Sequence, residues 1–567
     1  MIEQPEAVGV VCEYWNRFME REGEREAIVH WVAGEQPFRW TWGALGRAAY
    51  SYAARLKEQG VGRGHVCALI LRHNKDFYPI YMAVSSLGAL PSVLAYPNSR
   101  LHPDKFRHGL EGMARRSGLD WIVTERDLEA TIRPLVSNPD STIRGIFFPL
   151  EWGEQALVGR FEPHSGVSTD DPCLLQHSSG TTGLQKAVML SHRSILEHVR
   201  RYGKAIQASQ KDKVVSWLPL YHDMGLIAAF YLPLTLGMPL VQLNPFEWVS
   251  APIILLEAIS REKATLCWLP NFAYNLLADR VSADDVDGIR LDSVRMFVNC
   301  SEPIRNESHE RFFSRFESLG LRRNALGACY AMAETTFAVT QTLPGPEVKC
   351  LWVAREEIAK GNVRLVDSQA ANSRACVSSG VPISACEVRI VDERGNNLAP
   401  DRVGEIAVRS VSLFNGYRND PEKTSAVLRD GWYFTGDYGF VFEGECFVIG
   451  RKKDVIISAG NNIYPEDIED AVGQVKDVLP GRVIAFGIED ARSGTEQICV
   501  VAETPLFSAA EVEKKTLRKH IKEAGMAVDI TVSRVYLSPP RWLIKSSAGK
   551  PSRSANKERA LAELKYN

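Results

Sequence analysis

Apolar residues recur at helical spacing over residues 44–56, and a continuous apolar run follows at 66–71. This order predicts a helix and then a buried strand, with a second helix around 78–87. The same alternation returns further along the chain, at 121–124, 188–200, 264–269 and 294–299. Strands that alternate with helices in this way are typical of a parallel sheet covered by helices, so we expect an α/β fold with interlocked sheets.

The pattern changes after Val381, where short strands alternate with glycine and asparagine turns and predict a β-rich layer. Beyond that layer, helix and strand periods alternate again, which indicates a small α+β domain. We place the boundary at Gly450–Lys453, where a glycine precedes a charged run. The sequence therefore predicts a large N-terminal domain over 1–450 and a small, mobile C-terminal domain over 451–567, with a hinge near 451–453.

Composition indicates an ordinary globular protein. Of 567 residues, 45% are hydrophobic and 24% are charged, with a formal net charge of -2, so no nucleic-acid partner is expected. Eleven cysteines without a CxxC pair, and an acidic start where a secretory signal would be basic, predict reduced thiols and a cytoplasmic location. The most apolar stretch, 226–243, contains two prolines and a glycine, which favours a buried core segment over a membrane span.

The first candidate for chemistry is the segment 174–191, LLQHSSGTTGLQKAVMLS, where a predicted strand leads into a loop rich in hydroxyls and glycines. Glycines let backbone N–H groups turn toward an anion, hydroxyls add donors, and a lysine adds positive charge. The candidate phosphate-binding residues are Ser178, Ser179, Gly180, Thr181, Thr182, Gly183 and Lys186. The spacing differs from the GxxxxGK[ST] loop of kinases and ATPases, and an ordinary turn is the alternative.

A second cluster, ACYAMAETT at 328–336, follows a predicted strand. Tyr330 could stack on a base while Glu334 binds Mg²⁺ that bridges phosphates, because hard Mg²⁺ favours carboxylate and phosphate oxygens. The alternative is a solvated turn.

Two more clusters lie in the C-terminal part of the chain. The β-rich segment 431–454 brings Asp437 and Arg451 together, and this pair could hydrogen-bond the hydroxyls of a ribose or simply form a structural salt bridge. The segment KSSAGKPSR at 545–553 presents Lys550 on a Ser/Gly loop, for which a solvated basic tail is the alternative.

Together and in this order, these clusters resemble the signature of the adenylate-forming superfamily over essentially the whole chain. The resemblance implies nucleotide contacts from the phosphate loop, from Tyr330 at the adenine, and from Asp437 and Arg451 at the ribose. It further implies Glu334 as the magnesium ligand, Lys550 as the adenylation lysine and Lys453 as the hinge residue. The remaining nucleotide-binding residues that it implies are Ser301, Glu302, Pro303 and Thr335.

Such an enzyme would use ATP and Mg²⁺ to convert a carboxylic acid, lipid-like or bulky, into an acyl adenylate with release of pyrophosphate. It would then transfer the acyl group to a phosphopantetheine thiol, on an acyl carrier protein or on coenzyme A. A carboxylate attacking an α-phosphate is one anion meeting another, so catalysis must come from positioning and charge neutralisation. In this family the C-terminal domain swings about the hinge between the two half-reactions.

Within the superfamily, SWLPLYHDMGLI at 216–227, PNFAY at 270–274 and YAMAET at 330–335 look most like the fatty acyl-AMP ligases. The segment 351–380 is similar to the insertion of that branch, which is associated with transfer to an acyl carrier protein. The resemblance assigns the acyl pocket to Trp217, Trp268 and Asn271. It also puts His222 beside that pocket as a catalytic or gating residue, with a buried structural histidine as the alternative.

Several positions depart from the family pattern. Gln185, Ala187, Cys300 and Ala331 replace a proline or glycines near the expected nucleotide, and the bulk of Trp268 could reshape the acyl pocket toward a compact, cyclic or aryl acid. If the backbone at these positions needed positive φ or close approach to the nucleotide, the added side chains would slow or abolish adenylation. The alternatives are therefore an enzyme that performs only the thioester step on a preformed acyl adenylate, and a non-catalytic acyl-nucleotide binding protein.

Overall fold

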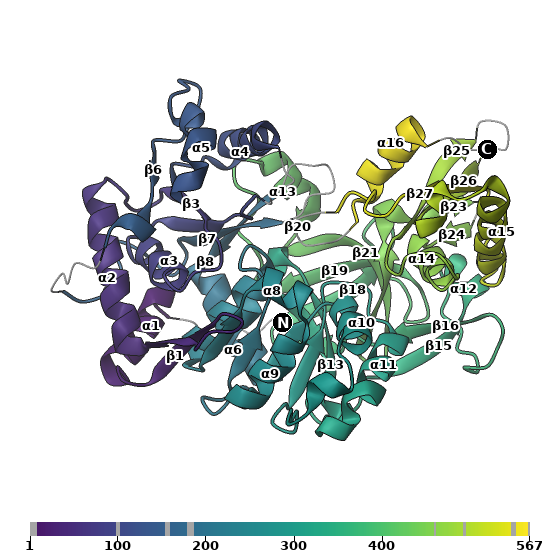
Figure 1. Cartoon of the computed structure of the whole chain (residues 1–567), viewed down its shortest axis with the longest axis horizontal. Helices are drawn as coiled ribbons and strands as arrows, with labels where there is room; N and C mark the ends of the chain where they lie inside the picture. Colours follow the sequence, from purple (N-terminus) through teal and green to yellow (C-terminus); the bar gives the residue numbers. More distant parts are fainter. Residues whose placement is uncertain are drawn as a thin grey trace.

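The computed structural model describes residues 8–97, 102–153, 159–178, 186–458, 461–490, 495–545 and 551–564. A large N-terminal body and a smaller C-terminal one lie side by side (Figure 1). Each has an apolar core of its own: one runs through most of the N-terminal body, and the other lies around Ile468, Val500 and Ile521. The expected α/β fold with a large and a small domain is confirmed.

The largest sheet has nine strands in the order β17-β14-β13-β12-β11-β9-β10-β1-β2. The neighbours from β13 to β1 run parallel, as the alternating sequence pattern predicts. The strand bounds are β1 Glu26–Trp31, β2 Phe38–Thr41, β9 Val214–Ser216, β10 Leu240–Leu243, β11 Leu266–Leu269, β12 Met296–Asn299, β13 Leu326–Ala331, β14 Ala338–Gln341 and β17 Val381–Pro382.

Helices pack around this sheet and supply most of the remaining core. They are α1 Val11–Arg21, α2 Trp42–Glu58, α3 Phe77–Ser86, α6 His192–Ala205, α7 Leu232–Leu236, α8 Pro245–Ser250, α9 Ile253–Glu262, α10 Asn271–Arg280 and α11 Asn306–Phe316. The apolar stretch 226–243 forms a π-helix (Met224–Tyr231), α7 and β10, and its large apolar side chains are buried. The buried-core interpretation is confirmed, and no helix in the described part of the chain is both long and apolar enough to cross a bilayer.

A second parallel sheet, β4-β3-β5-β6, stands beside the first and is covered by α4 Pro103–Ser117 and α5 Glu129–Val136. Its strands are β3 Val66–Ile70, β4 Leu90–Val93, β5 Trp121–Thr124 and β6 Gly145–Phe147. The prediction that 188–200 continues the parallel alternation is wrong for its strand. β8 (Lys186–Ser191) pairs antiparallel with β7 (Pro172–Ser178), because the two flank one loop and form a hairpin.

The β-rich layer expected after Val381 is a five-stranded antiparallel sheet. It consists of β18 Cys386–Val391, β19 Gly404–Ser410, β20 Leu428–Arg429, β21 Trp432–Phe442 and β22 Glu445–Arg451, with α13 Pro421–Val427 at its edge. The small domain follows as β23 Ile456–Ser458, β24 Asn461–Ile463, α14 Pro465–Gly473, β25 Val483–Asp490, β26 Thr495–Glu503, α15 Glu511–Met526, β27 Arg534–Ser538 and α16 Arg553–Glu563.

The segment 351–380 is more ordered than its loose sequence pattern suggests. Strands β15 (Cys350–Ala354) and β16 (Ser373–Val377) form a hairpin around the short helix α12 (Arg355–Ala359). In Figure 1 this hairpin lies next to the small domain. Arg374 of β16 donates to the Ile449 carbonyl at 3.1 Å and to Asp467 of α14 at 3.1 Å, with its guanidinium over the Tyr464 ring. The insertion therefore ties the small domain to the β-rich layer.

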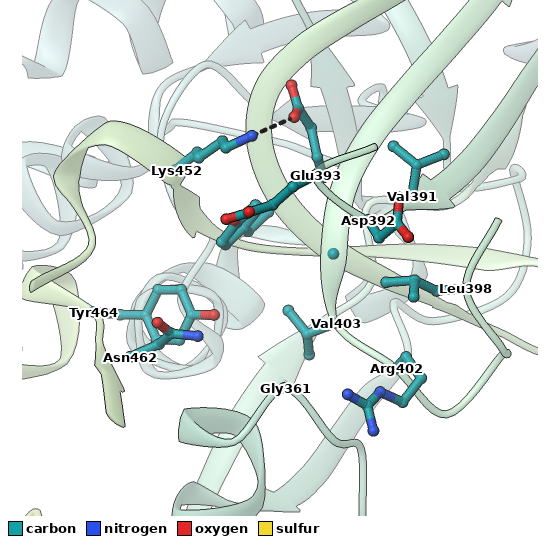
Figure 2. Close-up of a pocket in the computed structure, with 13 residues that line it drawn as sticks. Gly361, Val391, Asp392, Glu393, Leu398, Arg402, Val403, Lys452, Asn462 and Tyr464 are labelled. Atoms are coloured by element: carbon teal, nitrogen blue, oxygen red, sulfur yellow. Dashed lines mark hydrogen bonds and ion pairs between the residues drawn. The ribbon is translucent and has the colours of Figure 1, made fainter. Parts of the chain in front are cut away.

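A cavity of about 190 Å³ lies where the chain passes from the β-rich layer into the small domain (Figure 2). Val403 and Arg402 line one side, Asn462 and Tyr464 the other, and Lys452 forms an ion pair with Glu405 in its wall. The Tyr464 hydroxyl is buried and has no hydrogen-bond partner among the described residues. Packing is therefore incomplete at the connection between the domains.

Replacing Arg374 tests the tie between the domains. In Arg374→Ala, Asp467 loses a buried partner, so we expect the small domain to unfold or detach with a loss of about 3 kcal/mol. The measurement is denaturant unfolding combined with limited proteolysis of the connection. Arg364→Ala is the matched control, because Arg364 lies in the same insertion but pairs with Glu356 at the surface, where a pair is worth at most about 1 kcal/mol. Equal losses of stability in the two variants would contradict the role of Arg374 in holding the small domain to the β-rich layer.

Candidate functional site

Tyr330, Asp437 and Arg451 meet where the nine-stranded sheet and the five-stranded antiparallel sheet adjoin. Tyr330, near the carboxyl end of β13, donates its hydroxyl to Asp437 Oδ2 at 2.7 Å. Asp437 on β21 lies opposite Arg451 on β22 in the antiparallel register, and Arg451 Nε is 3.2 Å from Asp437 Oδ1. Burial and then the charge of Asp437 raise the pKa of Tyr330, so its hydroxyl stays protonated and remains a donor.

Lys186 and Glu334 are joined through a tyrosine. The Tyr417 hydroxyl donates to Glu334 Oε1 at 2.7 Å and accepts from Lys186 Nζ at 3.1 Å, while the lysine also lies over the tyrosine ring. Backbone hydrogen bonds of the segment 415–418 to β8 hold Tyr417 beside Lys186. The arrangement places a cation and a buried carboxylate on the two sides of one hydroxyl.

These two groups form one electrostatic site. The charges of Asp437 and Glu334 both act on Arg451, and those of Arg451 and Lys186 act on Lys453. Partial burial and then the charge of Arg451 lower the pKa of Lys453 to about 8. The structure thus gathers three cations and two carboxylates that are far apart in the sequence, a combination suited to an anionic ligand with several groups.

Two turns in this region hold residues with positive φ. Ser301 follows β12 with φ of 69°, and Thr336 follows the short helix Ala333–Thr335 with φ of 70°. For a β-branched residue such a conformation costs of order 1–3 kcal/mol and is held by its surroundings, here by the Thr336 hydroxyl bound to the Ser412 carbonyl at 2.8 Å. Thr335 is fully buried and donates to backbone carbonyls, so it shapes the turn that carries Glu334.

The replaced glycines do not carry this strain. Ala187, Cys300 and Ala331 all lie outside the positive-φ region, so their side chains need no unusual backbone conformation. Gln185 lies outside the described residues. The argument that these replacements disable the site through backbone strain therefore loses its basis at the three described positions.

The residues expected at an acyl pocket lie at the carboxyl ends of the neighbouring parallel strands. Trp217, just after β9, stacks on Trp248 of α8 at 3.7 Å between ring centroids, and Phe272 packs edge-on against both. Trp268 near the end of β11 is fully buried. His222 is partly exposed, with Nδ1 2.8 Å from Asp223 Oδ1.

The side-chain amide of Asn271 forms hydrogen bonds to other residues of the protein. Its Oδ1 accepts from Asn299 at 3.0 Å and from the Arg305 backbone N–H at 3.1 Å, and its Nδ2 donates to Ser308. These contacts fix the segment that carries Glu302, whose carboxylate accepts from the Phe272 N–H at 2.9 Å. Pro303 follows on the surface of the same turn.

Part of the expected site lies outside the described residues. This applies to Ser179, Gly180, Thr181, Thr182, Gly183 and Lys550, while Ser178 ends β7. The two ends of the 546–550 segment are described: Lys545 forms a β-bridge with Pro551, and the charge of Glu302 is among those that act on Lys545.

Sequence reasoning missed Tyr417 and Tyr433. Tyr433, on β21, is buried near Glu334, Tyr417 and Asp437, whose charges raise its pKa after burial itself. The available signal for Tyr417 was a tyrosine after a glycine in the polar run NGYRND, which by itself predicts a turn.

Removing the bridging hydroxyl tests the link between Lys186 and Glu334. In Tyr417→Phe the buried carboxylate of Glu334 loses a donor, so we expect the free energy of unfolding to fall by about 1–3 kcal/mol. Urea unfolding measures this. Tyr14→Phe is the control, because the Tyr14 hydroxyl bonds an exposed carbonyl at 3.3 Å and should matter little. An unchanged stability in Tyr417→Phe would show that the bridge is not formed.

Comparisons with known proteins identify the family of this chain. The family model for AMP-binding enzymes matches residues 15–418. The chain is 32% identical to the 4-hydroxyphenylalkanoate adenylyltransferase of Mycobacterium tuberculosis, over 92% of this chain and 86% of that protein. It is 33% identical to the medium-chain-fatty-acid–[acyl-carrier-protein] ligase JamA of Moorena producens, over 69% and 68% of the two chains.

Among solved structures, the fatty acyl-adenylate ligase from L. pneumophila in complex with acyl adenylate and pyrophosphate matches with a TM-score of 0.74 at 27% identity. That match covers 98% of this chain and 97% of the other. The resemblance seen in the sequence is confirmed: because the family model matches more than half of its length, the chain belongs to the AMP-binding enzyme family.

Proposed function

We propose that this protein is an acid-AMP ligase that activates a carboxylic acid with ATP, releases pyrophosphate and passes the acyl group to a phosphopantetheine thiol. The observation that carries the proposal is the convergence of Lys186, Glu334, Tyr330, Asp437 and Arg451 into one site in a chain of this family. The eleven cysteines are free thiols, which supports action in a reducing compartment such as the cytoplasm.

The nucleotide would lie across the junction of the nine-stranded sheet and the five-stranded antiparallel sheet. Tyr330 offers a ring at the carboxyl end of β13, and Asp437 with Arg451 offers acceptors and donors for ribose hydroxyls. Lys186, at the start of β8, follows the hydroxyl-rich loop and provides positive charge for phosphates. Anion meets anion in this reaction, so these cations act by neutralising charge and by positioning.

The residues present fit one magnesium ion bound mainly by substrate. In the described part of the chain, no three His, Cys, Asp or Glu side chains gather to hold a metal by themselves. Mg²⁺ in phosphate-transfer sites is commonly held by one or two carboxylates together with phosphate oxygens. Glu334 would supply that carboxylate, and the ion would neutralise phosphate charge during the attack. The Tyr417 hydroxyl fixes one oxygen of Glu334 and so orients the other.

We assign the domain boundary to 450–451 and the hinge to Lys453. β22 ends at Arg451, and the short helix Lys452–Asp454 leads into the small domain. Arg553 of α16 bonds Asp454 at 2.6 Å, so the C-terminal helix is tied to this connection. The charge of Glu302 acts on Lys545, just before the segment that contains Lys550, and this supports our proposal that Lys550 acts in adenylation.

The main alternative is an enzyme that forms only the thioester from a preformed acyl adenylate. This alternative was suggested by the replacement of glycines near the expected nucleotide. The ordinary backbone conformations of Ala187, Cys300 and Ala331 weaken that argument. We therefore favour complete activation. For the acceptor we propose an acyl carrier protein over coenzyme A, on the strength of the insertion at 351–380 and of the relative JamA, whose name specifies a carrier protein.

The test of this function is ATP–pyrophosphate exchange with a panel of fatty and aryl acids. We expect exchange with the wild type and a loss of about 100-fold or more in Lys550→Ala, because the lysine would neutralise transition-state charge. Lys519→Ala is the control, since Lys519 is an exposed lysine on the same small domain. Thioester formation is then compared with coenzyme A and with a carrier protein.

The outcomes separate the hypotheses. Exchange that persists in Lys550→Ala would refute the role of that lysine. Absence of exchange with every acid, alongside thioester formation from synthetic acyl adenylate, would establish the alternative.

The pH dependence tests Lys453. Because its pKa is lowered to about 8, Lys453 loses its positive charge as the pH rises through that value, and ATP should then bind more weakly. We expect the KM for ATP to rise above pH 8 in the wild type. Lys453→Arg keeps the charge, so its KM should stay level over this range, and Lys453→Gln should show a raised KM at neutral pH. An identical pH profile of the KM for ATP in the wild type and both variants would show that the charge of Lys453 does not contribute to ATP binding.

A further inference from the structure

The position of the acyl group follows from the sheet. In open α/β sheets ligands bind outside the carboxyl ends of the strands. The candidate nucleotide residues come from the ends of β12 and β13, and Asp437 closes the far side next to Tyr330. The acid must then approach over the ends of β11 and β9, the next strands in the sheet.

An aromatic wall stands at that place. The rings of Trp217, Trp248 and Phe272 pack on one another, and the last two belong to α8 and α10. Phe272 is 38% exposed, and its backbone N–H bonds the carboxylate of Glu302 in the candidate nucleotide segment. The exposed ring of Phe272, with Trp217 and Trp248 buried behind it, therefore adjoins the place where the carboxyl group would be activated.

Next to this aromatic wall, the buried side chain of Trp268 blocks the entry of an acyl group into the protein interior. Its indole N–H donates to the Tyr202 hydroxyl at 2.8 Å, and Tyr202 donates to Gln341 at 2.9 Å. This chain of hydrogen bonds joins β11, α6 and β14, and all three side chains are buried. Turning the indole aside would leave buried polar groups without partners, so Trp268 is a fixed barrier and not a movable gate.

The space beside the indole is filled as well. Cys300 at the end of β12 is fully buried, and its sulfur lies 3.0 Å from that of Met224 in the π-helix. Tyr202 also packs against His198 and Phe337 of neighbouring elements. A long unbranched chain entering from the carboxyl edge would have to displace several packed side chains.

We propose that Trp268 sets the acid specificity: it stops the acyl group at the carboxyl edge, so that the preferred substrate is a compact aryl acid lying against Trp217 and Phe272. A flat ring matches an aromatic wall through offset or edge contacts. This inference rests on the proposed adenylation activity and narrows its substrate class.

The first experiment uses the wild-type protein. AMP release and trapping of acyl adenylate with hydroxylamine are measured for benzoate, phenylpropanoate, octanoate and hexadecanoate. We expect kcat/KM for phenylpropanoate to exceed that for hexadecanoate by at least about tenfold, as pocket fit commonly discriminates. Equal or better use of hexadecanoate would overturn the inference. Absence of turnover with all acids would instead remove the proposed function, and the inference with it.

The second experiment changes the barrier. Trp268→Ala should shift the ratio of kcat/KM toward octanoate and hexadecanoate by at least about tenfold, and Trp268→Phe by less. Trp42→Phe is the control for loss of an equally buried indole far from the site, and its ratio should match the wild type. A Trp268→Ala protein that folds, as judged by its thermal transition, with an unchanged ratio would overturn the inference. If that variant fails to fold, the wild-type panel and Trp268→Phe decide.

Discussion

The pairing of Asp437 with Arg451 is the constraint on which the site depends. The register of β21 and β22 sets the two residues opposite each other, and the Tyr330 hydroxyl completes the group. The same strand, β22, then carries the chain out of the large domain. The β21–β22 pair thus positions candidate nucleotide contacts and also anchors the small domain. The contacts and the small domain are therefore coupled through the backbone at Arg451.

Charge is arranged around that pair with little redundancy. Lys186 and Lys453 provide positive charge from distant parts of the sequence, and the Tyr417 hydroxyl lies between Glu334 and Lys186. A direct ion pair would satisfy both groups and leave neither for a ligand. The interposed hydroxyl holds a cation and an anion close together without a direct ion pair between them.

Local periodicity predicted the elements well, because helices and buried strands are encoded by neighbouring residues. β3, β5, α2 and α3 lie within a few residues of where the pattern puts them. It failed where pairing is long-range. Tyr417 meets Lys186 across 231 positions, because backbone hydrogen bonds join the segment 415–418 to β8. β8 pairs with its neighbour in the sequence, β7, and there the error lay in the direction of the pairing, which hydrophobic spacing does not encode. The candidate site was found from four separate motifs, whereas Trp268 needed the structure to show what its indole bonds to.

The cavity beside Lys452 has a consequence for motion. Its two sides belong to different domains, with Val403 and Arg402 on one and Asn462 and Tyr464 on the other. Close-packed surfaces resist sliding, because every contact must be broken before another forms. An unfilled volume next to the proposed hinge at Lys453 would give side chains room to rearrange if the domains move. Incomplete packing at this point therefore lowers the resistance of the region to rearrangement.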